Sequence, residues 1–135
     1  MAHSVKRAAR LAKLLFSLDQ LERARLSSTE RAIEGVASEQ LAILGMFQND
    51  DGQYGQYVDL LSRRIKTLSV KASELEAEKA LIEGEIRKSA TRCKAAEVAL
   101  TDARKQFQMQ SDLREFTECL ELFATQGRGK SGSAS

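Results

Sequence analysis

The chain has 135 residues, 30% of them charged, with no tryptophan, no proline, two tyrosines and five phenylalanines. Straight-chain residues lose little conformational freedom in a helix, so this composition is typical of long helices and coiled coils and does not favour a globular core. The 21 basic and 19 acidic residues give a net charge of +2 and are mixed throughout. This balance argues against a protein whose main partner is nucleic acid.

The two cysteines, Cys93 and Cys119, are too few and too far apart to form a secreted disulfide framework or to coordinate a metal. We interpret Cys93 as a small apolar residue buried between helices. The chain has no uninterrupted apolar run of about 18 residues, the length that a membrane-spanning helix needs, so no such span is predicted.

The beginning of the chain is basic and amphipathic. Lys6, Arg7, Arg10 and Lys13 all precede the first acidic residue, Asp19, a pattern that is also typical of organelle-targeting presequences. Because the helical pattern continues through Asp19 without a cleavage-like break, we favour a permanent helix. A presequence, cleaved between about residues 15 and 30, is the alternative.

A first helix is predicted from about residue 4 to residue 48. Apolar residues that would hold it against a partner helix recur at helical spacing, namely Val5, Ala8, Leu11, Leu14 or Leu15, Leu18 and Leu21. The pattern then continues, with two successive steps of four that indicate a stutter, through Leu18, Glu22, Leu26, Thr29, Ile33, Val36, Gln40, Ile43 and Phe47. A helix break near residues 22–30 is the alternative, because Ser27 to Glu30 could cap a new helix.

The only strong turn signal inside the chain is the sequence from Asn49 to Gly52, with Gly55 shortly after it. Asn and Asp side chains bond to nearby backbone groups, and glycine adopts the positive φ that a chain reversal needs. We therefore predict that the chain turns back over residues 49–55.

A second, longer helix is predicted from about residue 56 to residue 124. Its core positions follow alternating steps of three and four, the coiled-coil spacing, through Val58, Leu61, Ile65, Leu68, Ala72, Leu75, Lys79, Ile82, Ile86, Ser89, Cys93, Ala96, Leu100, Ala103 and Phe107. Residues 1–124 are thus expected to form one all-α, antiparallel two-helix coiled-coil hairpin. The small, polar residues 125–135 are expected to be a disordered tail.

The two predicted helices differ in length, so the second should extend past the first. The surplus amounts to about 20 residues, or roughly 30 Å of helix. Past Phe107 the apolar positions slip by one and resume as Met109, Leu113, Phe116, Leu120 and Phe123. A bare apolar stripe of this length predicts a protein partner, self-association or a bend that covers it.

Catalysis is not expected. The single histidine, His3, lies at the start of the chain, and the sequence has neither a glycine-rich phosphate loop nor a cysteine paired with a histidine. We predict a non-enzymatic protein with no metal and no cofactor.

A basic first helix, a polar turn near residue 50, a longer returning helix and a polar tail resemble the FliJ/YscO family of type III export stalk proteins. The resemblance covers the whole chain and lies in its architecture and composition. It implies a bacterial cytoplasmic protein at the base of a flagellar or virulence secretion apparatus, peripheral to the inner membrane. The implied partners are a hexameric export ATPase, the export gate protein and secretion chaperones.

The resemblance also implies which residues contact these partners. The ATPase end would comprise Lys6, Arg7, Arg10, Lys13, Leu113, Phe116, Leu120 and Phe123, whereas Leu14, Leu18 and Leu21 would hold the hairpin together. The gate would meet exposed residues that flank the turn, namely Phe47, Tyr54 and Tyr57. Two other functions stay open: a scaffold or tether that associates with itself through the surplus helix, and an escort adaptor for secreted subunits.

Overall fold

The computed structural model describes the backbone of residues 2–48 and 55–133 and the side chains of residues 2–48 and 55–127. Two long helices make up this part of the chain: α1 (Ala2–Gln48) and α2 (Val58–Ser133), with the short 3-10 helix η1 (Gly55–Tyr57) before α2. No strand occurs within the described ranges. The absence of proline from the chain is consistent with helices of this length, because proline would remove a helical hydrogen bond.

The all-α, two-helix prediction is confirmed, and so is the greater length of the second helix. The alternative of a break near residues 22–30 is wrong, since α1 runs through this segment without interruption. Residues 49–54 of the predicted turn lie outside the described part of the chain. The predicted helix end at Ala124 differs from the structure, in which α2 continues to Ser133.

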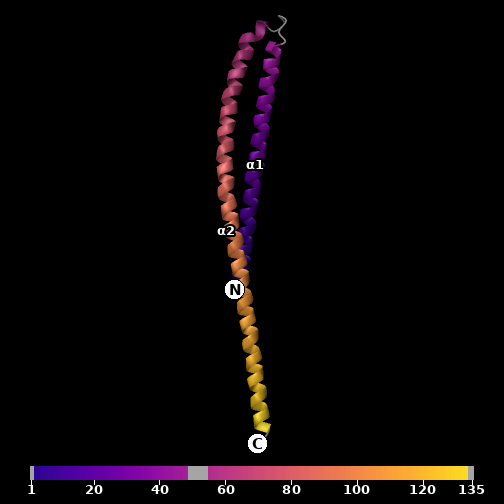
Figure 1. Ribbon diagram of the computed structural model, residues 1–135, viewed down its shortest axis with the longest axis vertical. Helices are drawn as coiled ribbons and strands as arrows, with labels where there is room; N and C mark the ends of the chain where they lie inside the picture. The colour runs from indigo at the N-terminus through magenta and orange to yellow at the C-terminus, as the bar shows by residue number, and fades with distance from the viewer. Residues whose placement is uncertain (1, 49–54, 134–135) are drawn as a thin grey trace. The chain divides into compact units, whose positions relative to one another are not determined.

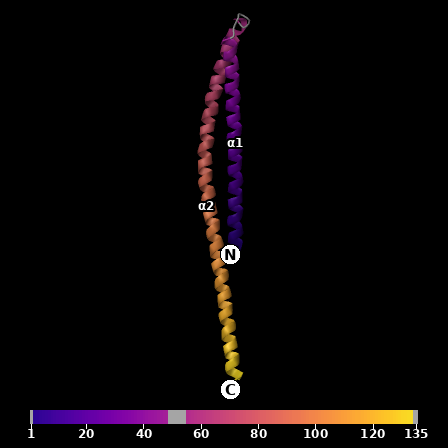
Figure 2. The ribbon, with the colours of Figure 1, turned by 45° about the vertical axis from the view of Figure 1, so that its right-hand side comes forward.

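The chain divides into two compact units, which we call the hairpin unit (Phe16–Arg92) and the terminal unit (Met1–Leu15 with Cys93–Ser135). In the hairpin unit, the last two thirds of α1 lie antiparallel beside the first half of α2 (Figures 1 and 2). The terminal unit combines the beginning of α1 with the second half of α2.

The core of the hairpin unit is a single row of side chains between the two helices. Val36, Ile43 and Leu68 form its best-buried cluster, against which Phe47, Leu61, Ile65, Ala72 and Leu75 pack. Leu68 and Ile82 are each only 1% exposed, and burying an aliphatic side chain of this size contributes about 1.5–3 kcal/mol. In α2 the predicted core row is confirmed, and only its end positions Val58 and Phe107 are exposed.

The core row of α1 differs from the prediction in its first half. Leu14, Leu18 and Leu21 are 57%, 48% and 66% exposed, so they do not hold the helices together. Leu11 is exposed as well. The core row instead consists of the buried or half-buried residues Val5, Ala8, Ala12, Leu15, Asp19, Glu22, Leu26, Thr29, Ile33, Val36, Gln40, Ile43 and Phe47, and the half-buried Ala9, Glu39 and Gly45 lie beside it.

The positions of the core row alternate steps of three and four without exception, so the predicted stutter is wrong. The prediction assigned leucines to the core, whereas the structure uses the residue that follows each of them. It thus placed Leu18 in the core, where the structure buries Asp19. The regular row faces α2 because it continues the side of α1 that carries the half-buried Ile33 and the buried Val36 and Ile43.

Asp19 is a buried charge within this row. Its Oδ2 accepts a hydrogen bond from Nε of Arg23 at 2.8 Å, one helical turn later. This bond outweighs the effect of burial and, with help from the Ser89 hydroxyl of α2, holds the pKa of Asp19 below its usual range. The second oxygen, Oδ1, is buried and has no hydrogen-bond partner among the described residues.

Charged pairs flank the core row of the hairpin unit and link its two helices. Arg25 lies 3.6 Å from Glu78, and the amine of Lys79 lies 4.0 Å from Glu30. Lys79 occupies a core position with its side chain 32% exposed, so its alkyl stem covers the core while its amine reaches the carboxylate. Exposed pairs of this kind contribute little to stability but favour one register.

In the terminal unit the core is thinner. Val5, Ala8, Ala12 and Leu15 of α1 are half-buried. The corresponding positions of α2 are Cys93, Ala96, Leu100 and Ala103, of which Ala96 is buried and the others half-buried. Cys93 therefore lies at a core position, as predicted. After Ala103, every α2 residue with a described side chain is exposed except Ser111, which is half-buried.

Candidate protein-binding surface

The most distinctive surface of the terminal unit is an apolar row on α2, which we call the C-terminal stripe: Met109, Leu113, Phe116, Leu120 and Phe123. These side chains are between 53% and 76% exposed, with Phe123 the most exposed. Their steps of four and three residues place all five on one side of the helix. Contiguous exposed apolar surface of this kind marks interaction sites on soluble proteins.

The stripe is exposed because α1 supplies no neighbour for this part of α2. The half-buried α1 residue nearest the beginning of the helix is Val5, and the half-buried core positions of α2 end at Ala103. Residues 104–127 are therefore exposed in the described terminal unit, Ser111 being the one half-buried position.

The stripe also faces a different direction from the core row of α2. Continuing the core row beyond Phe107 in the same steps leads to Gln110 and Arg114, whereas the apolar residues are Met109 and Leu113. A shift of one residue rotates the apolar face by about 100° around the helix. The one-residue slip of the apolar positions after Phe107 therefore turns the stripe away from the face of α2 that contacts α1.

The polar groups beside the stripe are satisfied within α2 itself. The hydroxyl of Thr117 donates a hydrogen bond to the carbonyl oxygen of Leu113 at 2.9 Å, and Nε2 of Gln108 donates one to Oδ1 of Asp112, also at 2.9 Å. A partner could therefore cover the Thr117 hydroxyl without leaving this donor unpaired, which lowers the cost of burial at this position. The stripe is suited to a largely apolar contact.

The predicted basic residues of the ATPase end, Lys6, Arg7, Arg10 and Lys13, are exposed on α1. His3, Lys6, Arg7 and Arg10 line a shallow depression with a volume of about 190 Å³. This cluster and the C-terminal stripe both belong to the terminal unit but lie on different helices. The terminal unit thus contains both groups of residues that the sequence assigned to the ATPase end.

The residues predicted to meet the export gate divide into three cases. Phe47 is half-buried and packs against the core of the hairpin unit, so the expectation that it is exposed is wrong. Tyr57 is 48% exposed in η1. Tyr54 lies outside the described residues.

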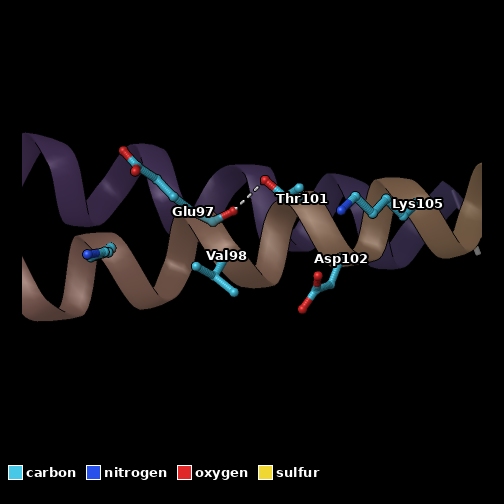
Figure 3. Close-up of a pocket in the computed structure, with 6 residues that line it drawn as sticks. Glu97, Val98, Thr101, Asp102 and Lys105 are labelled. Atoms are coloured by element: carbon cyan, nitrogen blue, oxygen red, sulfur yellow. Dashed lines mark hydrogen bonds between the residues drawn. The ribbon is translucent and has the colours of Figure 1, made fainter.

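Figure 3 shows another depression of the terminal unit, which lies along α2 and is lined by Lys94, Glu97, Val98, Thr101, Asp102 and Lys105. The hydroxyl of Thr101 donates a hydrogen bond to the carbonyl oxygen of Glu97 at 3.0 Å. In the described part of the chain, no cluster of three or more histidine, cysteine or acidic side chains could hold a metal ion. None of the helices in the described part of the chain is long and apolar enough to cross a membrane.

The C-terminal stripe is the candidate protein-binding surface of the terminal unit. No known protein family, curated protein or solved structure matches the chain.

The sequence interpretation missed one set of exposed residues. In the hairpin unit, Leu41 and Leu44 of α1 are 69% and 46% exposed and stand one residue after the core positions Gln40 and Ile43. The signal was present, because counting back from Phe47 in strict steps of four and three leaves both leucines outside the core row.

Proposed function

We propose that this chain is a non-enzymatic coiled-coil stalk of a type III protein export ATPase, in a flagellar or virulence secretion system of the bacterial cytoplasm. The observation that carries the proposal is the C-terminal stripe, five exposed apolar side chains on the part of α2 that follows its last half-buried core position, Ala103. The resemblance of the chain to the FliJ/YscO family supports the choice of partner.

In this proposal the ATPase ring contacts the terminal unit. Phe116 and Phe123 of the stripe enter apolar pockets between ATPase subunits, and the basic residues Lys6, Arg7 and Arg10 meet acidic side chains on the ring. Aromatic side chains commonly contribute most of the binding energy of such contacts. Tyr57 is the described residue that would face the export gate, while secretion chaperones would bind along the side of the helices.

The mechanism needs no reactive group in this chain. A single asymmetric helical pair inside a six-fold ring contacts the six subunits unequally. Unequal contacts favour some subunit conformations over others, and this bias can promote ring assembly or order the hydrolysis events.

The test is the ATPase activity and ring assembly of the export ATPase from the same organism, with and without the chain. We expect the chain to increase both. Phe116→Asp and Phe123→Asp should abolish the increase, and Phe116→Ala, which keeps helix propensity, should weaken it. Leu41→Asp is the matched control, because Leu41 is as exposed as Leu113 but lies in the hairpin unit.

Two outcomes would contradict the proposal. One is an ATPase whose hydrolysis and assembly do not respond to the chain. The other is an unchanged response to the chain that carries Phe116→Asp and Phe123→Asp together, which would remove the stripe from the contact.

A further inference from the structure

We propose that the C-terminal stripe also binds a second copy of this chain, with the two stripes packed antiparallel across a two-fold axis near Glu118. This pairing uses the same five side chains as the proposed ATPase contact. A partner that binds the stripe must therefore displace the second copy. The pairing itself does not depend on the proposed function.

The exposed area of the stripe is large enough for a stable pair. Met109, Leu113, Phe116, Leu120 and Phe123 are 68%, 69%, 62%, 53% and 76% exposed. A buried aromatic side chain covers about 150–250 Å², so two stripes would remove on the order of 1,000–1,300 Å² from water in total. This reaches the lower end of specific, stable interfaces, about 1,200 Å².

The positions on either side of the stripe favour a copy of the chain over a charged partner. They are Gln110, Asp112, Thr117, Cys119, Ala124 and Gln126, of which only Asp112 carries a charge. The charged residues Arg114, Glu115, Glu118 and Glu121 lie farther around the helix. Two copies can therefore approach each other without like charges meeting at the edge of the contact, which would oppose the pairing.

The order of side chains along the stripe favours the antiparallel arrangement. When the two-fold axis lies near Glu118, the leucine and phenylalanine layers each contain one of either kind: Phe116 opposite Leu120 of the second copy, and Leu113 opposite Phe123 of the second copy. Met109 falls opposite Gly127 of the second copy, at the edge of the contact. Layers that combine a large and a smaller side chain fill the space evenly. A parallel, in-register pair would instead stack phenylalanine on phenylalanine and leucine on leucine.

The charge of the terminal unit supports the same arrangement. A parallel pair would bring the basic residues Lys6, Arg7 and Arg10 of both copies to the same end of the contact. An antiparallel pair places the two basic clusters at opposite ends, where they are screened from each other by salt. It is also isologous, so two copies satisfy each other and the association closes at a dimer.

Sedimentation of the full-length chain over a range of concentrations tests the pairing. We expect a monomer–dimer equilibrium that Phe116→Asp weakens by more than about tenfold, and that the control Leu41→Asp leaves unchanged. A wild-type chain that stays monomeric at high micromolar concentration would overturn the proposal. So would a dimer that Phe116→Asp does not weaken, or one that Leu41→Asp weakens equally.

Cross-linking tests the direction. In a background with Cys93→Ala and Cys119→Ser, one chain carries Asp112→Cys and another carries Gln126→Cys. A short bismaleimide should join the two chains when they are mixed, and should join neither chain efficiently to itself. Efficient joining of each chain to itself, without mixed products, would overturn the antiparallel arrangement.

The ATPase assay separates this proposal from the proposed function, because it measures hydrolysis and ring assembly, whereas sedimentation of the chain alone measures the pairing. A dimer without any effect on the ATPase supports the pairing alone. A chain that stimulates the ATPase and never dimerises supports the function and overturns the pairing.

Discussion

Arg64 of α2 binds Glu39 of α1 through two hydrogen bonds, with Nε donating to Oε1 at 2.8 Å and Nη2 donating to Oε2 at 3.1 Å. The pair joins the two helices of the hairpin unit with fixed geometry, since both donors of the planar guanidinium meet both oxygens of the carboxylate. The bond lowers the pKa of Glu39 and raises that of Arg64. This contact selects one register of α1 against α2.

Acid should therefore destabilise the hairpin through Glu39. Its pKa in the folded chain is below the unfolded value of about 4.3, so the carboxylate stabilises the fold above that pH, and this contribution is lost as the pH falls through the folded value. We expect the Tm of the wild type to fall more between pH 6 and pH 3 than that of Glu39→Gln. The measurement is thermal unfolding followed by circular dichroism.

The partner variant provides the control for this prediction. Arg64→Gln removes the cause of the shift, so it should reduce the acid dependence to the same extent as Glu39→Gln, and the double variant should show no further reduction. Parallel acid profiles of the wild type and all three variants would show that the pair does not link protonation to folding.

Asp19 is a second test of the core row. Its Oδ1 is buried without a hydrogen-bond partner in the described part of the chain, and replacing a buried ionic group by an apolar residue is often stabilising. Asp19→Leu should therefore raise the Tm at neutral pH, whereas Asp19→Asn should lower it by losing the charge paired with Arg23. Thermal unfolding of both variants under one buffer condition checks the two signs. A lower Tm for Asp19→Leu would mean that the polar layer is needed for the fold.

The core of the hairpin unit should respond strongly to truncation. Leu68 is 1% exposed, so Leu68→Ala should lower the free energy of unfolding by about 2–5 kcal/mol. Leu81→Ala, on the same helix and 73% exposed, should change it by no more than about 0.5 kcal/mol. Urea unfolding of the two variants measures both values, and similar losses would contradict the placement of the core row.

The sequence predicted the core of α2 position by position, because a single row of apolar residues satisfies the coiled-coil spacing there. In α1 two rows compete. Leu11, Leu14, Leu18 and Leu21 have the same spacing as the true row and are more apolar than Ala12, Leu15, Asp19 and Glu22. Hydrophobicity alone favoured the leucine row, which the structure exposes. Only an unbroken count of steps of four and three back from Phe47 would have identified the buried row.

The candidate site was easier to predict than its surroundings. The C-terminal stripe follows from the lengths of the helices and from the slip after Phe107, both of which the sequence contains. Periodicity placed Phe47 in the core row of α1, and the structure packs it against the cluster of Val36, Ile43 and Leu68, so only its assignment to the gate surface does not fit.

The proposed contact between the C-terminal stripe and the ATPase is tested most directly by amide hydrogen exchange. Amide hydrogen exchange of the chain, measured below the concentration at which two copies pair, compares the free and ATPase-bound states. In the free chain, residues 109–123 should exchange faster than residues 61–100, because α1 does not cover them. On binding, protection should concentrate in residues 109–123. Protection confined to the hairpin unit, with no change at residues 109–123, would contradict the account.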